Sequence, residues 1–376
     1  MSRPSGDAPP PLDAVLDGVD LLVTCGPGGV GKTTCAAALG LAAARSGRDV
    51  VVLTVDPARR LADALGIDAS ASEPTRVTGV DEIDRAGGSL WALMLDAEAT
   101  FDQLVRNEAA DDEQAESILR NPVYRSITGA LAGAQEYMAV ERLHQLHTGE
   151  HDLVIVDTPP SRHALDLLEA PQRLSSFLGH PVYRTLTAPG RTFARVTNAA
   201  SSAFLWTVRK LAGPRIVEDT LEFFRSIAGM EAGLRRRADE VAALLRAERT
   251  AFVVVTSPRA EAIDESSFLL AGLTGGGFPV GGVIVNLIHP LPVELPGLDA
   301  DDRPGAAGDD PTGALTEQIA HHRDLRRLAL AERAELAAFV AAADAASAAV
   351  TELPLLHTDV HDLAGLTDLA GRLVPN

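Results

Sequence analysis

The chain has 376 residues, 46% of them hydrophobic, which is enough for one large α/β domain or two modest ones. The formal net charge of −19 argues against general binding to nucleic acid or to an anionic membrane surface. The two cysteines, Cys25 and Cys35, form no C-x-x-C pair, so the composition excludes zinc and disulfide frameworks.

The N-terminus, "MSRPSGDAPPPLD", is polar and proline-rich and has no apolar core of the kind found in signal peptides. We therefore expect a flexible tail over residues 1–18. No uninterrupted apolar stretch reaches membrane-spanning length, so we expect a cytoplasmic protein without an integral membrane segment.

Short, fully apolar runs alternate with stretches of helical periodicity along the chain. Strands are predicted at 21–24, 50–55, 153–156, 252–256 and 281–285, and helices at, for example, 32–45 and 101–119. Strands of this kind are typical of a mostly parallel sheet with helices on both faces, which is an α/β fold. In such sheets the ligand binds at the carboxyl ends of the strands.

Two segments interrupt this alternation within the domain predicted over residues 19–376. Residues 170–249 contain no convincing strand and are rich in aromatic residues, which indicates a helical insertion. Residues 296–315 are rich in Pro, Gly and Asp and are predicted to form a mobile loop. One long helix over 316–348 and a short strand near 351–356 follow, before a final helix.

The stretch "CGPGGVGKTT", directly after the first apolar run, fits two phosphate-binding patterns. As G-x-G-x-x-G it suggests a dinucleotide-binding turn, and Asp56 lies near the spacing of the acid that such a site uses for ribose. As G-x-x-x-x-G-K-[ST] it is a P-loop for a nucleoside triphosphate.

Two features favour the triphosphate. A dinucleotide turn has no use for Lys32 and Thr33, whereas a triphosphate site needs both, the lysine for the β- and γ-phosphates and the hydroxyl for Mg²⁺. In "LVIVDTPP", Asp157 ends an apolar strand, as a Walker B carboxylate that holds Mg²⁺ does. The sequence therefore predicts a P-loop NTPase that binds ATP with Mg²⁺, and the nucleotide-binding residues are predicted to be Gly28, Gly29, Val30, Gly31, Lys32, Thr33 and Thr34.

Three motifs together reveal a resemblance to a known family. "GPGGVGKTT", "TVDPARRLADALG" (54–66) and "VDTPPSRHALDLLEAP" (156–171) together resemble the arsenical-pump-type ATPases, which include the eukaryotic ATPase that targets tail-anchored membrane proteins. The likeness extends through "IVNLIHP" (284–290) and "LPLLHTDVHDL" (353–363). It is strongest to the actinobacterial members, in which two different family proteins work as a pair.

The resemblance implies roles for individual residues. Asp56 corresponds to the acid that positions the attacking water, so Asp56 and Lys32 are the predicted catalytic residues; Asp56 also fits as an N-cap of the following helix. Asn286 corresponds to the residue that reads adenine, although a strand-end Asn also caps turns. Pro354 corresponds to a segment that packs on the base, and core packing explains it equally well. His163 is expected to lie outside the catalytic chemistry.

Pro27 departs from the family pattern. This position is normally a lysine that reaches across a dimer to the partner's nucleotide, whereas Pro27 has neither a charge nor a backbone N–H. Three interpretations remain open: a heterodimer in which a paralogue supplies the lysine, a cation in cis from Arg59 or Arg60, and a nucleotide-gated scaffold or chaperone subunit that hydrolyses ATP poorly.

The helical insertion corresponds to the groove that holds an apolar client helix in the targeting ATPase. Here one helical face, which binds a client or packs on neighbouring helices, consists of Val217, Leu221, Phe224, Ile227 and Ala228, with Phe223 beside it. The chain lacks the cysteines of metalloid sites and of iron–sulfur reductases. It also lacks the basic amphipathic tail of surface-partitioning ATPases. We therefore expect a homo- or heterodimeric ATPase that binds no nucleic acid.

Overall fold

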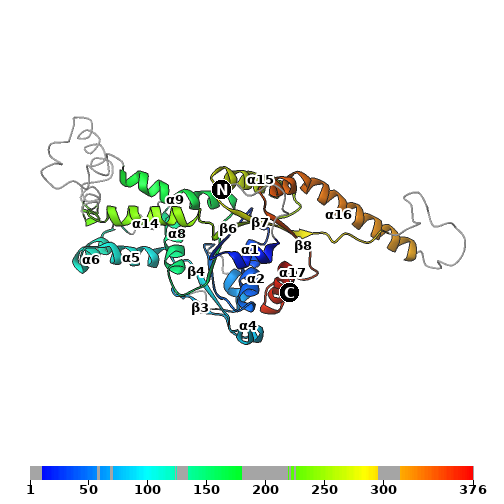
Figure 1. Cartoon of the computed structure of the whole chain (residues 1–376), viewed down its shortest axis with the longest axis horizontal. Helices are drawn as coiled ribbons and strands as arrows, with labels where there is room; N and C mark the ends of the chain where they lie inside the picture. Colours follow the sequence, from blue (N-terminus) through cyan, green and yellow to red (C-terminus); the bar gives the residue numbers. More distant parts are fainter. Residues whose placement is uncertain are drawn as a thin grey trace, which may run out of the picture.

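The protein is built around an eight-stranded sheet. The structure is a computed structural model, and it describes residues 11–56, 60–67, 71–122, 124, 134–179, 219, 222–223, 226–294 and 314–375. The strand order is β3-β4-β2-β5-β1-β6-β7-β8, and Figure 1 shows β3 and β4 on one side of the sheet and β7 and β8 on the other. All neighbours pair in parallel except β3 and β4. The strands are β1 Leu21–Cys25, β2 Asp49–Thr54, β3 Thr75–Arg76, β4 Ser89–Met94, β5 Leu153–Asp157, β6 Thr250–Thr256, β7 Val280–Ile288 and β8 Ala349–Pro354. The predicted α/β class with a mostly parallel sheet is confirmed.

Strands β3 and β4 were not predicted. The sequence of β4, "SLWALM", has none of the β-branched residues that marked the other strands, yet it pairs with all six residues of β2. Strand β3 has two residues and pairs only with β4, so its sequence carries no periodicity that could reveal it.

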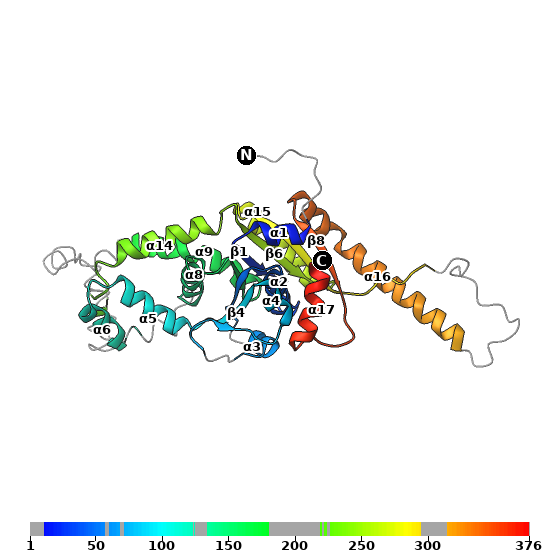
Figure 2. The ribbon, with the colours of Figure 1, turned by 60° about the horizontal axis from the view of Figure 1, so that its bottom comes forward.

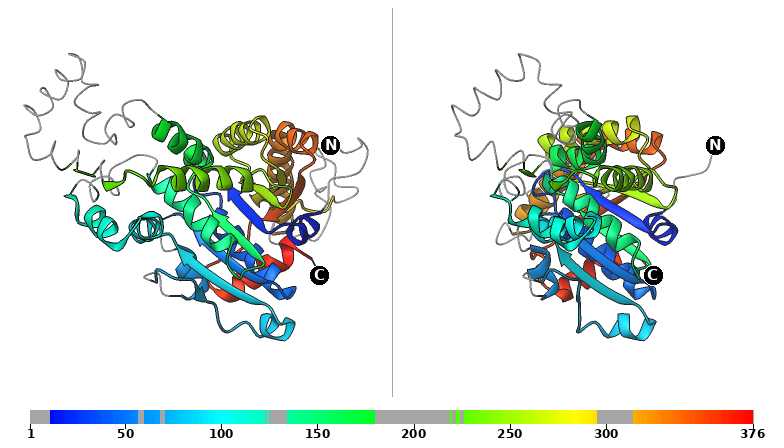
Figure 3. Two further views of the ribbon diagram at one scale, coloured as in Figure 1. Left: turned by 60° about the vertical axis from the view of Figure 1, so that its left-hand side comes forward. Right: turned by 90° about the vertical axis from the view of Figure 1, so that its left-hand side faces the viewer.

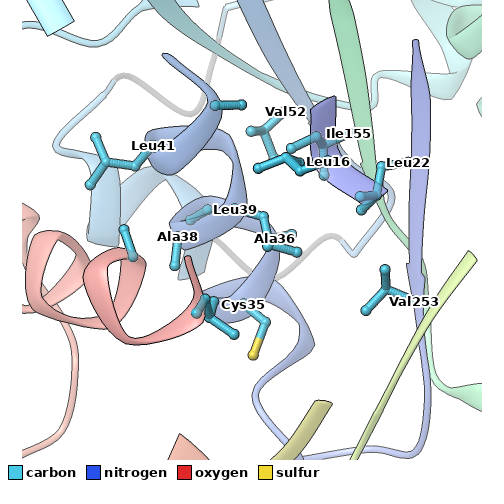
Figure 4. Packing of buried hydrophobic residues seen from close by; sticks show 14 of the residues in the cluster. Leu16, Leu22, Cys35, Ala36, Ala38, Leu39, Leu41, Val52, Ile155 and Val253 are labelled. Carbon is cyan, nitrogen blue, oxygen red and sulfur yellow. The ribbon is translucent and has the colours of Figure 1, made fainter. Parts of the chain in front are cut away.

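One face of the sheet is covered by α1 (Leu12–Gly18), α2 (Lys32–Arg45), α3 (Arg60–Leu65), α4 (Asp81–Ala86) and α17 (Leu363–Leu373). Helix α2 lies between α17 and the strands (Figure 4). Gly40 lets α2 approach the sheet closely, since a Cβ at this position would lie 2.7 Å from Val52 Cγ2. This close packing fixes the start of α2, and with it the glycine-rich loop.

The prediction of a flexible tail is wrong for residues 12–18. They form α1, whose Leu12, Val15 and Leu16 are buried in the core under the sheet. The spacing i, i+3, i+4 places these three side chains on one helical face, which is enough to dock a short helix. Residues 1–10 of the predicted tail lie outside the described part of the chain.

The other face is covered by longer helices, α8 (Ala134–His147), α9 (Ser161–Gly179), α14 (Glu231–Leu244), α15 (Ala260–Gly275) and α16 (Ala314–Ala345). The outer parts of α9 and α14 project from the sheet together with α5 (Ala97–Glu108) and α6 (Asp112–Arg120), as Figures 2 and 3 show. The long helix α16 projects on the opposite side (Figure 1).

The helix predictions hold in part. The helix expected over 32–45 coincides with α2, and that expected over 316–348 corresponds to α16. The stretch 101–119 forms two helices, α5 and α6, because Asp111 accepts a hydrogen bond from Gln114 N and starts a new helix there. Of the predicted insertion over 170–249, the end of α9 and all of α14 are described, and most of the remainder lies outside the described residues, as does most of the predicted loop at 296–315.

Candidate functional site

The glycine-rich loop connects the carboxyl end of β1 to the start of α2. Gly26, Gly29 and Gly31 have positive φ angles of 150°, 74° and 89°, a region that favours glycine. A Cβ on Gly26 would lie 2.0 Å from the carbonyl oxygen of Val255 on β6, so this position admits no side chain. Gly28 and Gly29 are exposed, and the loop ends at the N-terminus of α2, where backbone N–H groups favour a phosphate.

Lys32 is folded back onto the loop. Its Nζ donates a hydrogen bond of 2.8 Å to the carbonyl oxygen of Pro27, and the side chain is buried. Burial lowers the pKa of Lys32, and the nearby carboxylates of Asp157 and Asp56 oppose this effect. The lysine is thus a buried cation at the turn of the loop, where a bound phosphate would replace the Pro27 carbonyl as its partner.

Asp157 is fully buried at the end of β5. Its Oδ2 accepts hydrogen bonds from Thr33 Oγ1 (2.7 Å) and from Thr54 Oγ1 (2.9 Å). Burial raises the pKa of Asp157, against the lowering effect of these two hydrogen bonds and of Lys32. Its Oδ1 is buried and has no hydrogen-bond partner among the described residues, which is costly unless another group completes the site.

This donor set fits Mg²⁺. Magnesium prefers oxygen ligands and is held by one or two protein groups together with phosphates and water. The free Oδ1 of Asp157 and the hydroxyl of Thr33 are such groups and lie side by side. Among the described residues there is no cluster of three or more His, Cys, Asp or Glu side chains that could hold a metal without a phosphate.

Asp56 follows β2 directly and is half-buried. Its backbone N–H donates to Thr54 Oγ1 (3.3 Å), so one threonine hydroxyl links the backbone of Asp56 to the carboxylate of Asp157. The structure thus brings Asp56, Asp157 and Lys32 to one edge of the sheet. Residues 57–59, including Arg59, lie outside the described part of the chain. Because these residues would follow an N-cap at Asp56, the role of Asp56 as a helix cap stays a prediction.

Asn286 lies near the end of β7 and contacts the loop. Its Nδ2 donates to the carbonyl oxygen of Val30 (2.8 Å), and its Oδ1 accepts from the N–H of Leu287 (2.9 Å), a residue with φ of 62°. Through the first of these contacts the amide ties β7 to the loop, and the two roles that the sequence left open for Asn286 stay predictions. Pro354 ends β8 and pairs with Ile288 of β7 in the sheet register.

Thr54 and Glu332 at this edge were missed by the sequence analysis. Thr54 could have been noticed as a hydroxyl that ends an apolar strand two residues before an acid. Glu332 of α16 binds His289 through the backbone N–H (2.9 Å) and through Nδ1 (2.6 Å), and no local pattern reveals this long-range contact. The side chain of His163 lies outside the described residues.

Comparison with known proteins places these features in a family. The family model described as anion-transporting ATPase matches residues 19–295. The chain is 28% identical to "ATPase GET3C" of Arabidopsis thaliana over 283 residues, which cover 70% of this chain and 66% of that protein. It is 28% identical to "ATPase ARSA1" of Chlamydomonas reinhardtii over 285 residues, covering 70% and 34%. It is 26% identical to "ATPase GET3" of Chaetomium globosum over 293 residues, covering 76% and 79%.

The chain therefore spans about two thirds of the length of ATPase GET3C, about one third of ATPase ARSA1 and 79% of the Chaetomium globosum ATPase GET3. The match confirms the resemblance drawn from the sequence motifs. Among the described helices, none combines the length and the apolar character needed to cross a bilayer.

Proposed function

Because the chain belongs to the anion-transporting ATPase family, we propose that it binds Mg²⁺·ATP at the glycine-rich loop and hydrolyses the β–γ phosphoanhydride. The observation that carries this proposal is the contact of Thr33 with Asp157 beside an unpartnered, buried Asp157 Oδ1. Bound magnesium neutralises charge on the phosphates. Thr33 and Asp157 would hold it, and Lys32 would leave the Pro27 carbonyl for the phosphates.

Asp56 is the residue that we propose positions the attacking water. Hydrolysis of a phosphoanhydride depends mostly on positioning and charge stabilisation, and a carboxylate at the end of β2 lies at the same edge as Asp157. Asn286 supports the loop from β7, and its role in reading adenine stays a prediction, as does base packing by Pro354. The cytoplasmic location expected from the sequence also stays a prediction.

The test measures binding and turnover separately. We expect Asp56→Asn to retain ATP affinity, measured by calorimetry, while ATP turnover falls about 100-fold, the loss that misplacing one reacting group produces. Lys32→Ala should abolish binding. Asp84→Asn, an exposed position on α4, serves as the matched control and should change neither quantity. Unchanged turnover in Asp56→Asn would contradict the catalytic role, and heat from NADH but none from ATP would contradict the whole proposal.

A dimer is the second part of the proposal, because the family resemblance implies one and Pro27 removes the lysine that would act across it. Mixing the protein with a lysine-bearing paralogue should then raise ATP turnover above the sum of the separate rates. No gain would leave a cation in cis or a weakly hydrolysing scaffold. The hydrogen bond from Lys32 to the Pro27 carbonyl is a reason to keep the weakly hydrolysing scaffold as an alternative, because ATP must displace this contact to bind Lys32.

We also propose that nucleotide state moves the projecting helices, with an apolar helical client as the partner implied by the resemblance. Of the aromatic residues predicted to lie in the insertion, Phe223 is buried among Val105, Ile118, Tyr124 and Met230. This residue packs within the projecting helices, so a client surface must be formed by others. Crosslinking from the outer ends of α9 and α14, with and without ATP, tests whether a client binds there.

A further inference from the structure

The exposed side of the glycine-rich loop has no cation of its own. The loop carries Pro27 at the position where the family resemblance implies a lysine, and Pro27 is buried while Gly28 and Gly29 are exposed. Lys32, the loop's single charged residue, lies buried on the inner side. Lys32 would reach a bound triphosphate from the inner side, so further positive charge on the exposed side has to come from another element.

The segment after β6 runs beside this loop. Strands β1 and β6 pair in parallel through Cys25 and Val254, so the residues that follow each strand lie next to one another. The close approach of Gly26 to the carbonyl of Val255 shows how tight this contact is. Four residues further on, Arg259 forms the N-cap of α15.

The guanidinium of Arg259 lies against the exposed turn of the loop. A Cβ built on Gly29 would be 3.7 Å from Arg259 Nη2, and Arg259 is exposed to solvent. Its Nε donates to Ser257 Oγ (3.3 Å), and Ser257 is buried at the end of β6, so the inner end of the side chain has an anchor.

Arg259 is also available as a cation. Within the described part of the chain it has no carboxylate partner, although the protein carries 52 acidic and 33 basic residues. By contrast, Arg237 and Arg249 are both held by carboxylates. A guanidinium with free N–H groups at the rim of a phosphate-binding loop is suited to bidentate contact with phosphate oxygens.

We propose that Arg259 supplies, in cis, the cation that recognises the terminal phosphate of a nucleoside triphosphate bound at this loop, in place of the charge that Pro27 does not provide. This inference rests on the proposed function, because it requires the loop to bind ATP. It assigns the charge to the β6–α15 connection rather than to Arg59 or Arg60 after β2. It also predicts that one chain discriminates ATP from ADP without a partner.

The test measures the affinities of two nucleotides, ADP and the non-hydrolysable ATP analogue AMP-PNP, by calorimetry in the presence of MgCl₂. Arg259→Ala should weaken AMP-PNP about tenfold and ADP by less than about threefold, as expected for the loss of one charge-assisted contact to the third phosphate. Arg259→Lys should lie between, because it keeps the charge and loses the fork. Arg327→Ala, at an exposed position on α16, is the matched control and should bind both nucleotides as the wild type does.

Affinities of Arg259→Ala within about twofold of the wild type for both nucleotides would overturn the inference, because such a change is too small for a lost ionic contact. Equal weakening of ADP and AMP-PNP would overturn the assignment to the terminal phosphate. An AMP-PNP affinity that differs between wild type and Arg259→Ala only at protein concentrations where a dimer forms would overturn the assignment in cis. The proposed function fails separately, through a wild type that binds neither nucleotide or a Lys32→Ala variant that binds both normally.

Discussion

Asn286 offers a sharp test of how the glycine-rich loop is held. Its amide joins two elements that are far apart in the chain, since Nδ2 donates to the carbonyl of Val30 in the loop and Oδ1 accepts from the N–H of Leu287 on β7. The side chain also fills the space beside Gly31, where a Cβ would lie 2.4 Å from Nδ2. Asn286→Ala removes both hydrogen bonds at once.

The structure sets the magnitude of this loss. Each hydrogen bond contributes about 1 kcal/mol net, and a buried group left without a partner costs about 1–3 kcal/mol more. Val30 is fully buried, so its carbonyl gains no water in exchange. Leu287 has a φ of 62°, a conformation that costs a residue with a Cβ about 1–2 kcal/mol and that the Asn286 contact helps to hold. We expect the free energy of unfolding to fall by about 2–4 kcal/mol.

Urea denaturation of the nucleotide-free protein measures this change. Asn286→Asp is the informative companion, because it keeps the acceptor for Leu287 but places an oxygen against the Val30 carbonyl, and it should destabilise at least as much as alanine. A loss of stability below about 0.5 kcal/mol in both variants would refute the reasoning, because changes of that size are typical of surface positions. If the variants instead lower the affinity for ATP and spare that for GTP, Asn286 reads adenine.

Three further predictions use other parts of the structure. Gly26→Ala should lower the free energy of unfolding by about 3 kcal/mol or more, because the new Cβ clashes with a backbone carbonyl of β6 and the φ angle is strained. Gly18→Ala, which has open space around it, is the control and should change the free energy of unfolding little in the same urea titration. Burial raises the pKa of Cys25 and of Cys35 from 9.0 to about 12, so alkylation at pH 8 should be about 1,000-fold slower in the native protein than after unfolding. Any stability that the protein gains from these neutral thiols is present below pH 9 and is lost as the pH rises toward 12. Rapid labelling of the native protein would contradict this prediction. Leu16→Ala in α1 should lower the free energy of unfolding by about 2–4 kcal/mol, and a negligible loss in thermal unfolding would return this segment to the flexible tail that its sequence suggests.

The sequence predicted the elements whose patterns are local. Strands β1, β2 and β5 are apolar and β-branched, and each is followed by a residue type that marks its end, so both the strands and their functional edge could be placed. Helix α1 was missed because seven residues after a run of prolines carry too little periodicity to outweigh composition. Its position depends on the hydrophobic surface of the sheet, which no local pattern describes.

The same limit applies to the site. The motif itself indicated Lys32, Thr33 and Asp157, since each has a defined place in a phosphate-binding pattern. Thr54 and Arg259 belong to no motif, and their relevance follows from strand order. Strand β2 lies beside β5, which brings Thr54 to Asp157, and β6 lies beside β1, which brings Arg259 to the loop. These contacts join residues about 100 or more positions apart, so they become visible only in the folded chain.

Helices α5, α8 and α14 are tied together by one network of ion pairs. Arg237 of α14 donates from Nε to Glu108 of α5 and from Nη1 to Glu141 of α8, both at 2.7 Å. Gly233 leaves room for this network, because a Cβ there would overlap the Glu108 carboxylate. Glu141 is almost completely buried, and breaking a buried ion pair costs about 3–5 kcal/mol, so α5, α8 and α14 resist separate movement.

Helix α9 connects these helices to the candidate site. It begins at Ser161, four residues after Asp157, and packs on both α8 and α14. The connection is short and anchored, since Thr158 Oγ1 donates to the carbonyl of Thr24 on β1 (2.9 Å). Under the proposed function, a displacement at Asp157 on binding Mg²⁺·ATP would be absorbed between residues 158 and 161 or passed on to α9. Because α9 packs against helices that are tied to one another, we expect the projecting helices to move together as a rigid body rather than to change their internal packing.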